Sequence, residues 1–253
     1  MTLAEAAEAA ASPQEGFEDT EGFEDTDGFE DTALREVAGR TRPLTLARDR
    51  CLPVLPALAP LLPEAGLRRG STVAVTGSVT LAMALLAGPS AAGSWGAVVG
   101  LPSLGAEAAA ELGVALERLA LVPEPGIERW PVVVAALLED LDIVLAMPPP
   151  KVRAAHARRL TARARERDGV LVVLGSRGLG AEPVDLRLTV TGGRWMGLGR
   201  GHGRLVARQV EVVARGRRAA ARERRARLWL PGPNGEVEPV DDDVVLAGLV
   251  ATG

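Results

Sequence analysis

Apolar residues between positions 71 and 176 alternate between the spacing of strands and the spacing of helices. Short apolar runs bounded by glycine or turn residues predict buried strands, and the stretches between them predict helices. The predicted strands are residues 71–77, 95–100, 116–122, 142–147 and 170–176. The predicted helices are residues 78–88, 104–114, 130–141 and 152–169. We expect the first helix to end at Gly88 and Pro89, and the second to have Gly113 near its C-cap.

The pattern changes after residue 185, where apolar and polar residues alternate one by one. Residues 185–190, 204–213 and 226–230 have this alternation, which is typical of half-exposed antiparallel strands at a sheet edge. The predicted fold class is therefore α/β: a mostly parallel twisted sheet flanked by helices, with antiparallel edge strands near the C-terminus. The glycine-rich residues 192–205 are interpreted as a flexible hairpin connection. The alternative is a loop that contacts DNA or a partner through Arg194, Arg200 and Arg204.

The ends of the chain differ from this core in composition. The predicted parts are a disordered acidic tail at 1–40, a proline-rich helical lead-in at 41–66, the core domain at 67–235 and an acidic C-terminal tail at 236–253. Residues 16–32 repeat the hexapeptide GFEDTE with small variations and contain all three phenylalanines of the chain. The repeat is either a solvated expansion or an acidic, aromatic segment that docks on a basic partner or on the arginine-rich half of the chain.

Composition narrows the class of protein. Hydrophobic residues make up 47% of the chain but aromatic residues only 3%, so we expect an aliphatic core. No apolar run is long enough to span a membrane, and the acidic start lacks the features of a secretory signal, so we expect a cytoplasmic protein. A single cysteine, Cys51, excludes an intramolecular disulfide and a multi-cysteine zinc site, and it is interpreted as a small core residue.

Charge is segregated along the chain. Residues 151–227 contain 20 Arg and Lys against six Asp and Glu, whereas the charged residues before position 36 are almost all acidic. Positive charge is densest in the run ARGRRAAARERRAR at 214–227. This run is interpreted as a solvated linker, as a phosphate contact or as the site of an acidic protein partner. The residues predicted to contact a partner or DNA are Arg217, Arg218, Arg222, Arg224 and Arg225.

Several segments between residues 67 and 230 resemble the RecA ATPase core. GLRRGSTVAVTG resembles the strand that leads into the phosphate loop of that family, and VVGLPSLGAEAAAELGVALERLALVPEPG resembles the strand, helix and LGV segment that follow. VVVAALLEDLDIVLAM and ARRLTARARERDGVLVVLGS stand where RecA has later helix and strand pairs. The resemblance implies a RecA-like fold.

The residues that carry ATPase chemistry in that family are absent here. The degenerate phosphate loop is Gly77, Ser78, Val79 and Thr80, with no lysine in reach, because Lys151 is the only lysine of the chain. Ala146-Met147-Pro148, Gly100-Leu101-Pro102 and Gly175-Ser176 stand where the metal-holding aspartate, the catalytic glutamate and the γ-phosphate sensor are expected. We therefore predict a pseudo-ATPase with no catalytic residues and no cofactor. Ser78 and Thr80 are interpreted as an N-cap in a shortened turn, and the alternative is that they bind an anion through the helix dipole.

The histidines and the glycine-rich run predict neither a metal site nor a dinucleotide site. His156 and His202 have no acidic or cysteine partner at ligand spacing, so we predict no metal site. GLGRGHG leads into a predicted strand, whereas a dinucleotide-binding glycine loop must lead into a helix.

The stretches LPVLPALAPLLPEAGLRRGSTVAV, GHGRL and RARLWLPGP resemble the actinobacterial ImuA-prime mutasome accessory family. The resemblance implies a non-catalytic adaptor in DNA-damage-induced translesion synthesis and mutagenesis, associated with the nucleoid after damage. The implied partners are an ImuB-like Y-family polymerase homologue and, through it, an error-prone C-family replicative polymerase and the sliding clamp. Two alternatives remain: a DNA-binding RecA paralogue that modulates recombination, and a cell-division inhibitor similar to SulA.

Overall fold

A computed structural model describes residues 50–175, 179–180, 183–198 and 203–240 of the chain. The predicted acidic tail at 1–40 and most of the predicted C-terminal tail at 236–253 lie outside the described residues. Within the described residues, no helix has the length and apolar content needed to cross a membrane.

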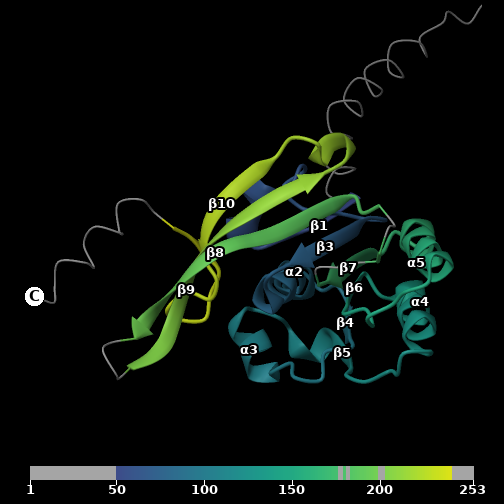
Figure 1. Cartoon of the computed structure of the whole chain (residues 1–253), viewed down its shortest axis with the longest axis horizontal. Helices are drawn as coiled ribbons and strands as arrows, with labels where there is room; N and C mark the ends of the chain where they lie inside the picture. The colour runs from purple at the N-terminus through teal and green to yellow at the C-terminus, as the bar shows by residue number, and fades with distance from the viewer. Residues whose placement is uncertain (1–49, 176–178, 181–182, 199–202, 241–253) are drawn as a thin grey trace, which may run out of the picture. The chain divides into compact units, whose positions relative to one another are not determined.

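A nine-stranded sheet organises the described chain (Figure 1). Its strands are β3 (Thr72–Thr76), β4 (Gly96–Val99), β5 (Leu119–Val122), β6 (Ile143–Ala146), β7 (Val170–Leu174), β8 (Leu186–Leu198), β9 (Gly203–Gly216), β10 (Arg224–Trp229) and β11 (Glu238–Pro239). Their order across the sheet is β11-β10-β9-β8-β3-β7-β6-β4-β5. The strands from β8 to β5 pair in parallel, whereas β9, β10 and β11 pair antiparallel. The predicted α/β class, with antiparallel strands at the C-terminal edge, is confirmed.

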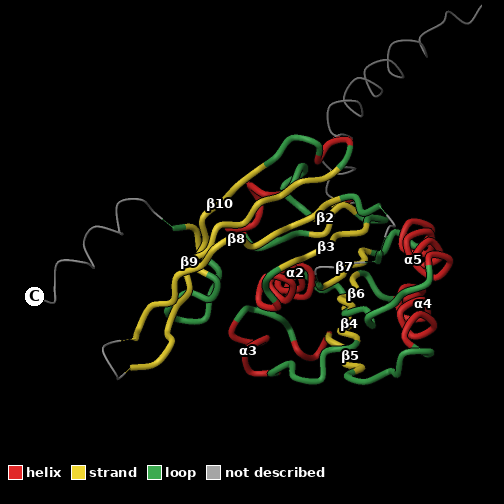
Figure 2. The backbone as a smooth tube through the Cα atoms, in the orientation of Figure 1, coloured by secondary structure: helices red, strands yellow, loops and turns green. Residues whose placement is uncertain are grey.

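Helices cover both faces of the parallel strands (Figures 1 and 2). The α-helices are α2 (Val79–Ala91), α3 (Ala106–Glu111), α4 (Trp130–Asp140) and α5 (Ala154–Glu166). Short 3-10 helices are η1 (Pro56–Leu61), η2 (Leu116–Arg118) and η3 (Arg218–Ala220). Side chains of β6 and β7 alternate between two buried clusters, one around α2 and the other around α4 and α5. This arrangement explains the continuous apolar runs of these strands, because both of their faces are covered.

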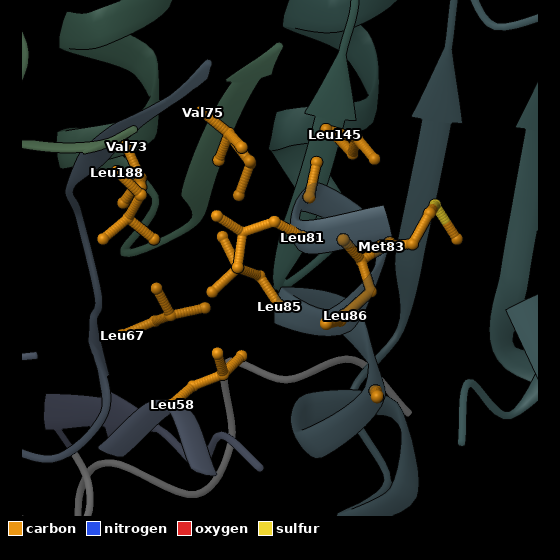
Figure 3. Packing of buried hydrophobic residues seen from close by; sticks show 14 of the residues in the cluster. Leu58, Leu67, Val73, Val75, Leu81, Met83, Leu85, Leu86, Leu145 and Leu188 are labelled. Atoms are coloured by element: carbon orange, nitrogen blue, oxygen red, sulfur yellow. The ribbon is translucent and has the colours of Figure 1, made fainter. Parts of the chain in front are cut away.

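The α2 helix is covered on all sides along its middle, where every residue from Leu81 to Ala87 is buried. Leu81 and Leu85 pack toward Val75 and Leu188 of the sheet, and Leu86 faces Leu58 of η1 (Figure 3). The proline-rich lead-in therefore belongs to the same core. The lead-in also contains β1 (Cys51–Leu52), which pairs with β2 (Leu67–Arg68) at the start of the predicted core domain. The sequence did not predict this strand pair.

The predicted end of the first helix at Gly88 and Pro89 is wrong. The α2 helix continues through both residues to Ala91, and Pro89 and Ser90 are buried. A Cβ atom on Gly88 would lie 2.6 Å from the Cα of Val54, so the glycine allows the lead-in to pack directly on the helix. Close packing at this turn stabilises a helical end that local propensity alone disfavours.

The predicted C-cap at Gly113 is confirmed. Gly113 has a φ of 90°. The amides of Gly113 and Val114 donate to the carbonyls of Ala110 (2.8 Å) and Ala109 (3.0 Å), which is the Schellman pattern. The strand predicted at 116–122 is shorter in the structure, because η2 occupies its first three residues.

The interpretation of residues 192–205 as a flexible connection is wrong for the residues that the structure describes. Residues up to Leu198 belong to β8, and β9 begins at Gly203. Pairing continues through Arg194 with Gln209 and Trp195 with Arg208, after an irregularity that follows Thr191. The two strands form a long hairpin that extends past the neighbouring strands (Figure 1), and we call its outer part, residues 191–198 and 203–209, the arm.

Candidate functional site

The turn between β3 and α2 stands where a phosphate loop would be. It contains only Gly77 and Ser78, because β3 ends at Thr76 and α2 begins at Val79. The Ser78 hydroxyl accepts a hydrogen bond from the Leu81 amide at 3.1 Å, so the prediction that Ser78 is an N-cap is confirmed. Thr80 lies within the helix, not at its cap. Two residues cannot wrap around a phosphate as the longer loop does.

A cavity of about 200 Å³ lies beside this turn. Val79, Thr80 and Met83 of α2 line it together with residues of α3 and the segment before α3. Among the described residues that line it, Glu111 is the only ionisable one. The cavity therefore offers no positive charge to a phosphate, and its acidic residue would repel one.

The backbone closes the neighbouring position at the end of β4. Gly100 has a φ of 81°, and a Cβ atom on it would lie 2.7 Å from the carbonyl oxygen of Met147. No side chain fits at position 100 without a backbone movement. A glutamate, the residue expected here in the RecA family, is therefore excluded at this position of the backbone. Met147, which follows β6, donates its amide to the Val99 carbonyl at 2.9 Å. Ser176, the predicted counterpart of the γ-phosphate sensor, lies outside the described residues.

Of the five predicted contact arginines, Arg217, Arg218 and Arg222 lie in the connection between β9 and β10, and Arg224 and Arg225 begin β10. They divide into two groups. Arg217 anchors the connection to the start of β8: its guanidinium donates to the carbonyls of Val184 (3.1 Å) and Pro183 (3.3 Å) and lies 3.5 Å from the Asp185 carboxylate. Arg218 follows in η3 and is exposed, with a φ of 54°.

Arg222, Arg224 and Arg225 form the second group, in which cations and carboxylates are interleaved. The Arg225 guanidinium lies 2.7 Å from the Glu223 carboxylate and 3.4 Å from that of Glu211. Arg215 also pairs with Glu223, and hydrogen bonds from Arg215 and then Arg225 lower the pKa of the Glu223 carboxyl. Neighbouring carboxylates thus offset part of the positive charge that the sequence concentrates here.

The arm carries exposed apolar side chains that the sequence analysis did not single out. Leu198 is 63% exposed, and Trp195, Met196, Leu205 and Val206 are exposed as well. The guanidinium of Arg208 stacks over the Trp195 ring at 5.7 Å from its centroid. Contiguous exposed apolar residues are typical of an interaction surface. The alternation of apolar residues in the strand at 204–213 predicted that one face of the strand is exposed. It did not predict that both faces are exposed at residues 203–206.

His156 lies on α5 beside a shallow hollow of about 40 Å³ that Glu128 and Lys151 also line. In the part of the chain that the structure describes, no group of three His, Cys, Asp or Glu residues is placed to hold a metal ion. His202 and Arg200 lie outside that part.

Part of the chain is similar to known sequences. A segment of 106 residues is 41% identical to Rv3395c, an uncharacterized protein of Mycobacterium tuberculosis. The segment is 41% of this chain and 51% of that protein, so the chain spans about half the length of its relative. A family match covers residues 60–178, so the arm and the five arginines lie beyond it. Residues 60–178, from the end of η1 past β7, match the MT3502 N-terminal domain family.

Proposed function

We propose that this protein is a non-catalytic, RecA-like adaptor in DNA-damage-induced translesion synthesis in the cytoplasm. It holds an ImuB-like Y-family polymerase homologue and, through it, an error-prone C-family polymerase and the sliding clamp. The resemblance to the ImuA-prime family suggests these partners. The observation that carries the proposal is the arm, which presents apolar side chains to solvent, on a fold in which the described residues that line the cavity beside the degenerate phosphate loop include no cation.

Lack of positive charge among the described residues that line this cavity supports a role without ATP. The turn of Gly77 and Ser78 is short, and the cavity beside it is lined by neutral residues and Glu111. Equilibrium dialysis with ATP and Mg²⁺ tests this part of the proposal. We expect no binding at millimolar ATP, and micromolar affinity would contradict a pseudo-ATPase.

The arm supports a role in protein binding. Trp and Met are enriched at the centres of protein interfaces, and apolar side chains on an exposed hairpin can enter a groove of a partner. Arg194, Arg204 and Arg208 lie on the same strands and can form the polar rim of such an interface.

The decisive experiment replaces Met196, Leu198 and Leu205 with serine in the full chain. We expect co-purification with the Y-family homologue to fall at least about tenfold, because buried apolar anchors dominate interface energies. A matched control replaces Ile127 and Val132 with serine, since these side chains are 66% and 68% exposed near or on α4. Equal binding of the partner by the two variants would show that the arm is not part of the interface.

Replacement of Arg222, Arg224 and Arg225 with glutamine tests the second predicted contact surface. The fold should stay intact, because these exposed or half-exposed side chains lie outside the core. Damage-induced mutagenesis and co-purification at low salt should both fall. Normal activity in cells would make this segment a solvated connection.

The alternative of a DNA-binding RecA paralogue is favoured by the positive charge of the arm and of β10. A gel-shift titration against salt separates it from the adaptor. Tight binding with a steep salt dependence would favour direct DNA contact, and absence of binding without a partner would favour the adaptor. A role like that of SulA in cell division has no specific observation in its favour.

A further inference from the structure

A second cavity, of about 240 Å³, lies at the opposite end of the parallel strands from the degenerate phosphate loop. Ser71, just before β3, and Leu186, at the start of β8, lie in its wall. The other walls come from β2, from the end of α5 and from η3. Segments near residues 68, 165 and 218 therefore meet in one place.

The interior of this cavity is apolar and its rim is cationic. Leu62, Leu67, Val73 and Ala220 are buried members of the core that also line the cavity. Five arginines line it against three carboxylates. A ligand that matches this surface has an apolar group and more than one negative charge.

Two of the five arginines are already engaged. Arg69 lies 2.8 Å from the Asp142 carboxylate, and Arg217 pairs with Asp185 and two backbone carbonyls. The other three, Arg68, Arg165 and Arg218, are exposed and have no ion pair within the described residues.

The carboxylates of the wall are partly engaged as well. Glu64 accepts a hydrogen bond from the Cys51 thiol at 3.2 Å. Asp185 accepts one from the Thr72 amide at 3.0 Å, in addition to its ion pair with Arg217. Three guanidinium groups are thus left to face an incoming ligand, with Asp168 as the third carboxylate of the wall.

Backbone geometry independently marks the same place. Ala65, Asp168 and Arg218 are the non-glycine residues with positive φ among the described residues, at 52°, 53° and 54°. Asp168 and Arg218 line the cavity, and Ala65 lies between Glu64 and Gly66, which also line it. Such conformations persist where the surrounding structure fixes them, and they cluster at binding sites.

We propose that this cavity binds an acidic peptide segment that inserts one aromatic side chain and places its carboxylates on Arg68, Arg165 and Arg218. The volume lies below the range of about 300–1,000 Å³ of small-molecule pockets and suits a single inserted side chain. Arginine clusters recognise acidic motifs through paired hydrogen bonds to carboxylates. The arginines come from three separate segments around an apolar interior, so they suit an extended peptide better than a compact phosphate.

Residues 16–32 of this chain have the chemistry of such a ligand, with three phenylalanines among Glu and Asp. A fluorescein-labelled synthetic peptide of this sequence is therefore the probe. The receptor is the full chain with Phe17, Phe23 and Phe29 replaced by alanine, so that its own repeat does not compete. Anisotropy titration at low salt should give saturable binding. A peptide with alanine in place of each phenylalanine, and one with Asn and Gln in place of the acids, should each bind at least about tenfold more weakly.

The site is tested by replacing Arg68, Arg165 and Arg218 with glutamine, which should weaken peptide binding at least about tenfold. The control replaces Arg153, Arg158 and Arg159, which are exposed at or near the start of α5, and should leave binding unchanged. The two variants lose the same charge, so a difference between them isolates the cavity from long-range attraction. Melting temperatures of both variants verify folding.

Three outcomes would overturn the proposal: no saturable binding, equal binding by the two variants, or displacement of the peptide by low-millimolar inorganic phosphate. The third would identify a small-anion site. The arm variants of the adaptor test do not touch this cavity, so failure of one proposal leaves the other standing.

Discussion

Strands β6 and β7 differ from the arm in where their apolar residues lie. Every residue of β6 and β7 is buried, with alternate side chains in the clusters on the two faces of the sheet. In the arm, residues 191–198 are all exposed, although they include Trp195 and Leu198. Hydrophobic burial thus stabilises the parallel strands, whereas backbone pairing holds the arm and leaves its apolar side chains exposed. Similar residue types stabilise the fold in one region, and in the other they form the surface that we propose for partner binding.

The largest expected difference between the two regions is in the loss of stability when a leucine is replaced with alanine. Leu145 on β6 is fully buried, so Leu145→Ala should lower the free energy of unfolding by about 2–5 kcal/mol. Leu198→Ala on the arm should change it by less than about 0.5 kcal/mol. Urea unfolding followed by circular dichroism measures both. A comparable loss in both variants would mean that the arm packs against the body.

A smaller effect is expected where the lead-in packs on α2. Gly88→Ala should destabilise the protein by about 1–3 kcal/mol, because its Cβ would overlap the backbone of Val54. Gly105→Ala serves as the control, since its Cβ would meet only Ala108, at 3.7 Å, and its φ is an ordinary −80°. The control should change stability by less than about 1 kcal/mol. Equal effects in urea unfolding would show that the contact with the lead-in is dispensable.

The turn of the degenerate phosphate loop should contribute to the stability of the protein only through the N-cap hydrogen bond of Ser78. Ser78→Ala should cost about 1 kcal/mol, since the Leu81 amide loses its acceptor. Ser78→Thr keeps a hydroxyl and should retain most of the stability. Thermal unfolding measures the difference, and co-purification with the proposed partner should not change in either variant. Reduced co-purification by Ser78→Thr would assign this turn a role in recognition.

The smallest effect concerns chemical reactivity rather than stability. Burial, and then the hydrogen bond with Glu64, raise the pKa of the Cys51 thiol to about 11. At pH 8 the thiolate fraction should be about 100-fold lower than for a thiol of pKa 9.0, and alkylation by iodoacetamide correspondingly slower. Glu64→Gln removes a negative charge that raises the pKa, so alkylation should become faster. An alkylation rate equal to that of an unfolded peptide would contradict this environment.

The sequence predicted the elements whose stability is local or whose burial is complete. The helix at 130–141 and the strand at 170–176 match α4 and β7 closely, because apolar spacing reports burial directly. The extension of α2 past Pro89 could not be predicted, since it depends on contact with Val54, more than 30 residues earlier. The strand at 204–213 was predicted, but the outer part of β8, residues 191–198, was missed because its glycines indicated a loop, whereas cross-strand pairing determines the structure.

The candidate sites were predicted unevenly for the same reason. Ser78 was recognised as a cap from its position before an apolar helical run, which is local information. The cavity formed around Arg68, Arg165 and Arg218 depends on strand order, which no single segment encodes. The ion pair of Arg225 with Glu211 depends likewise on the register between β9 and β10.

Strand β8 has a hydrogen-bonded neighbour strand on each side only near its start. It pairs with β3 through residues 186–189, and beyond them β9 is its one neighbour in the sheet. Two residues can therefore be added to each strand of the hairpin, or removed from it, without moving any core residue, and each side chain keeps its face. The reach of the hairpin can thus change in steps of two residues per strand while the body stays the same, so reach and stability are separable properties of this fold.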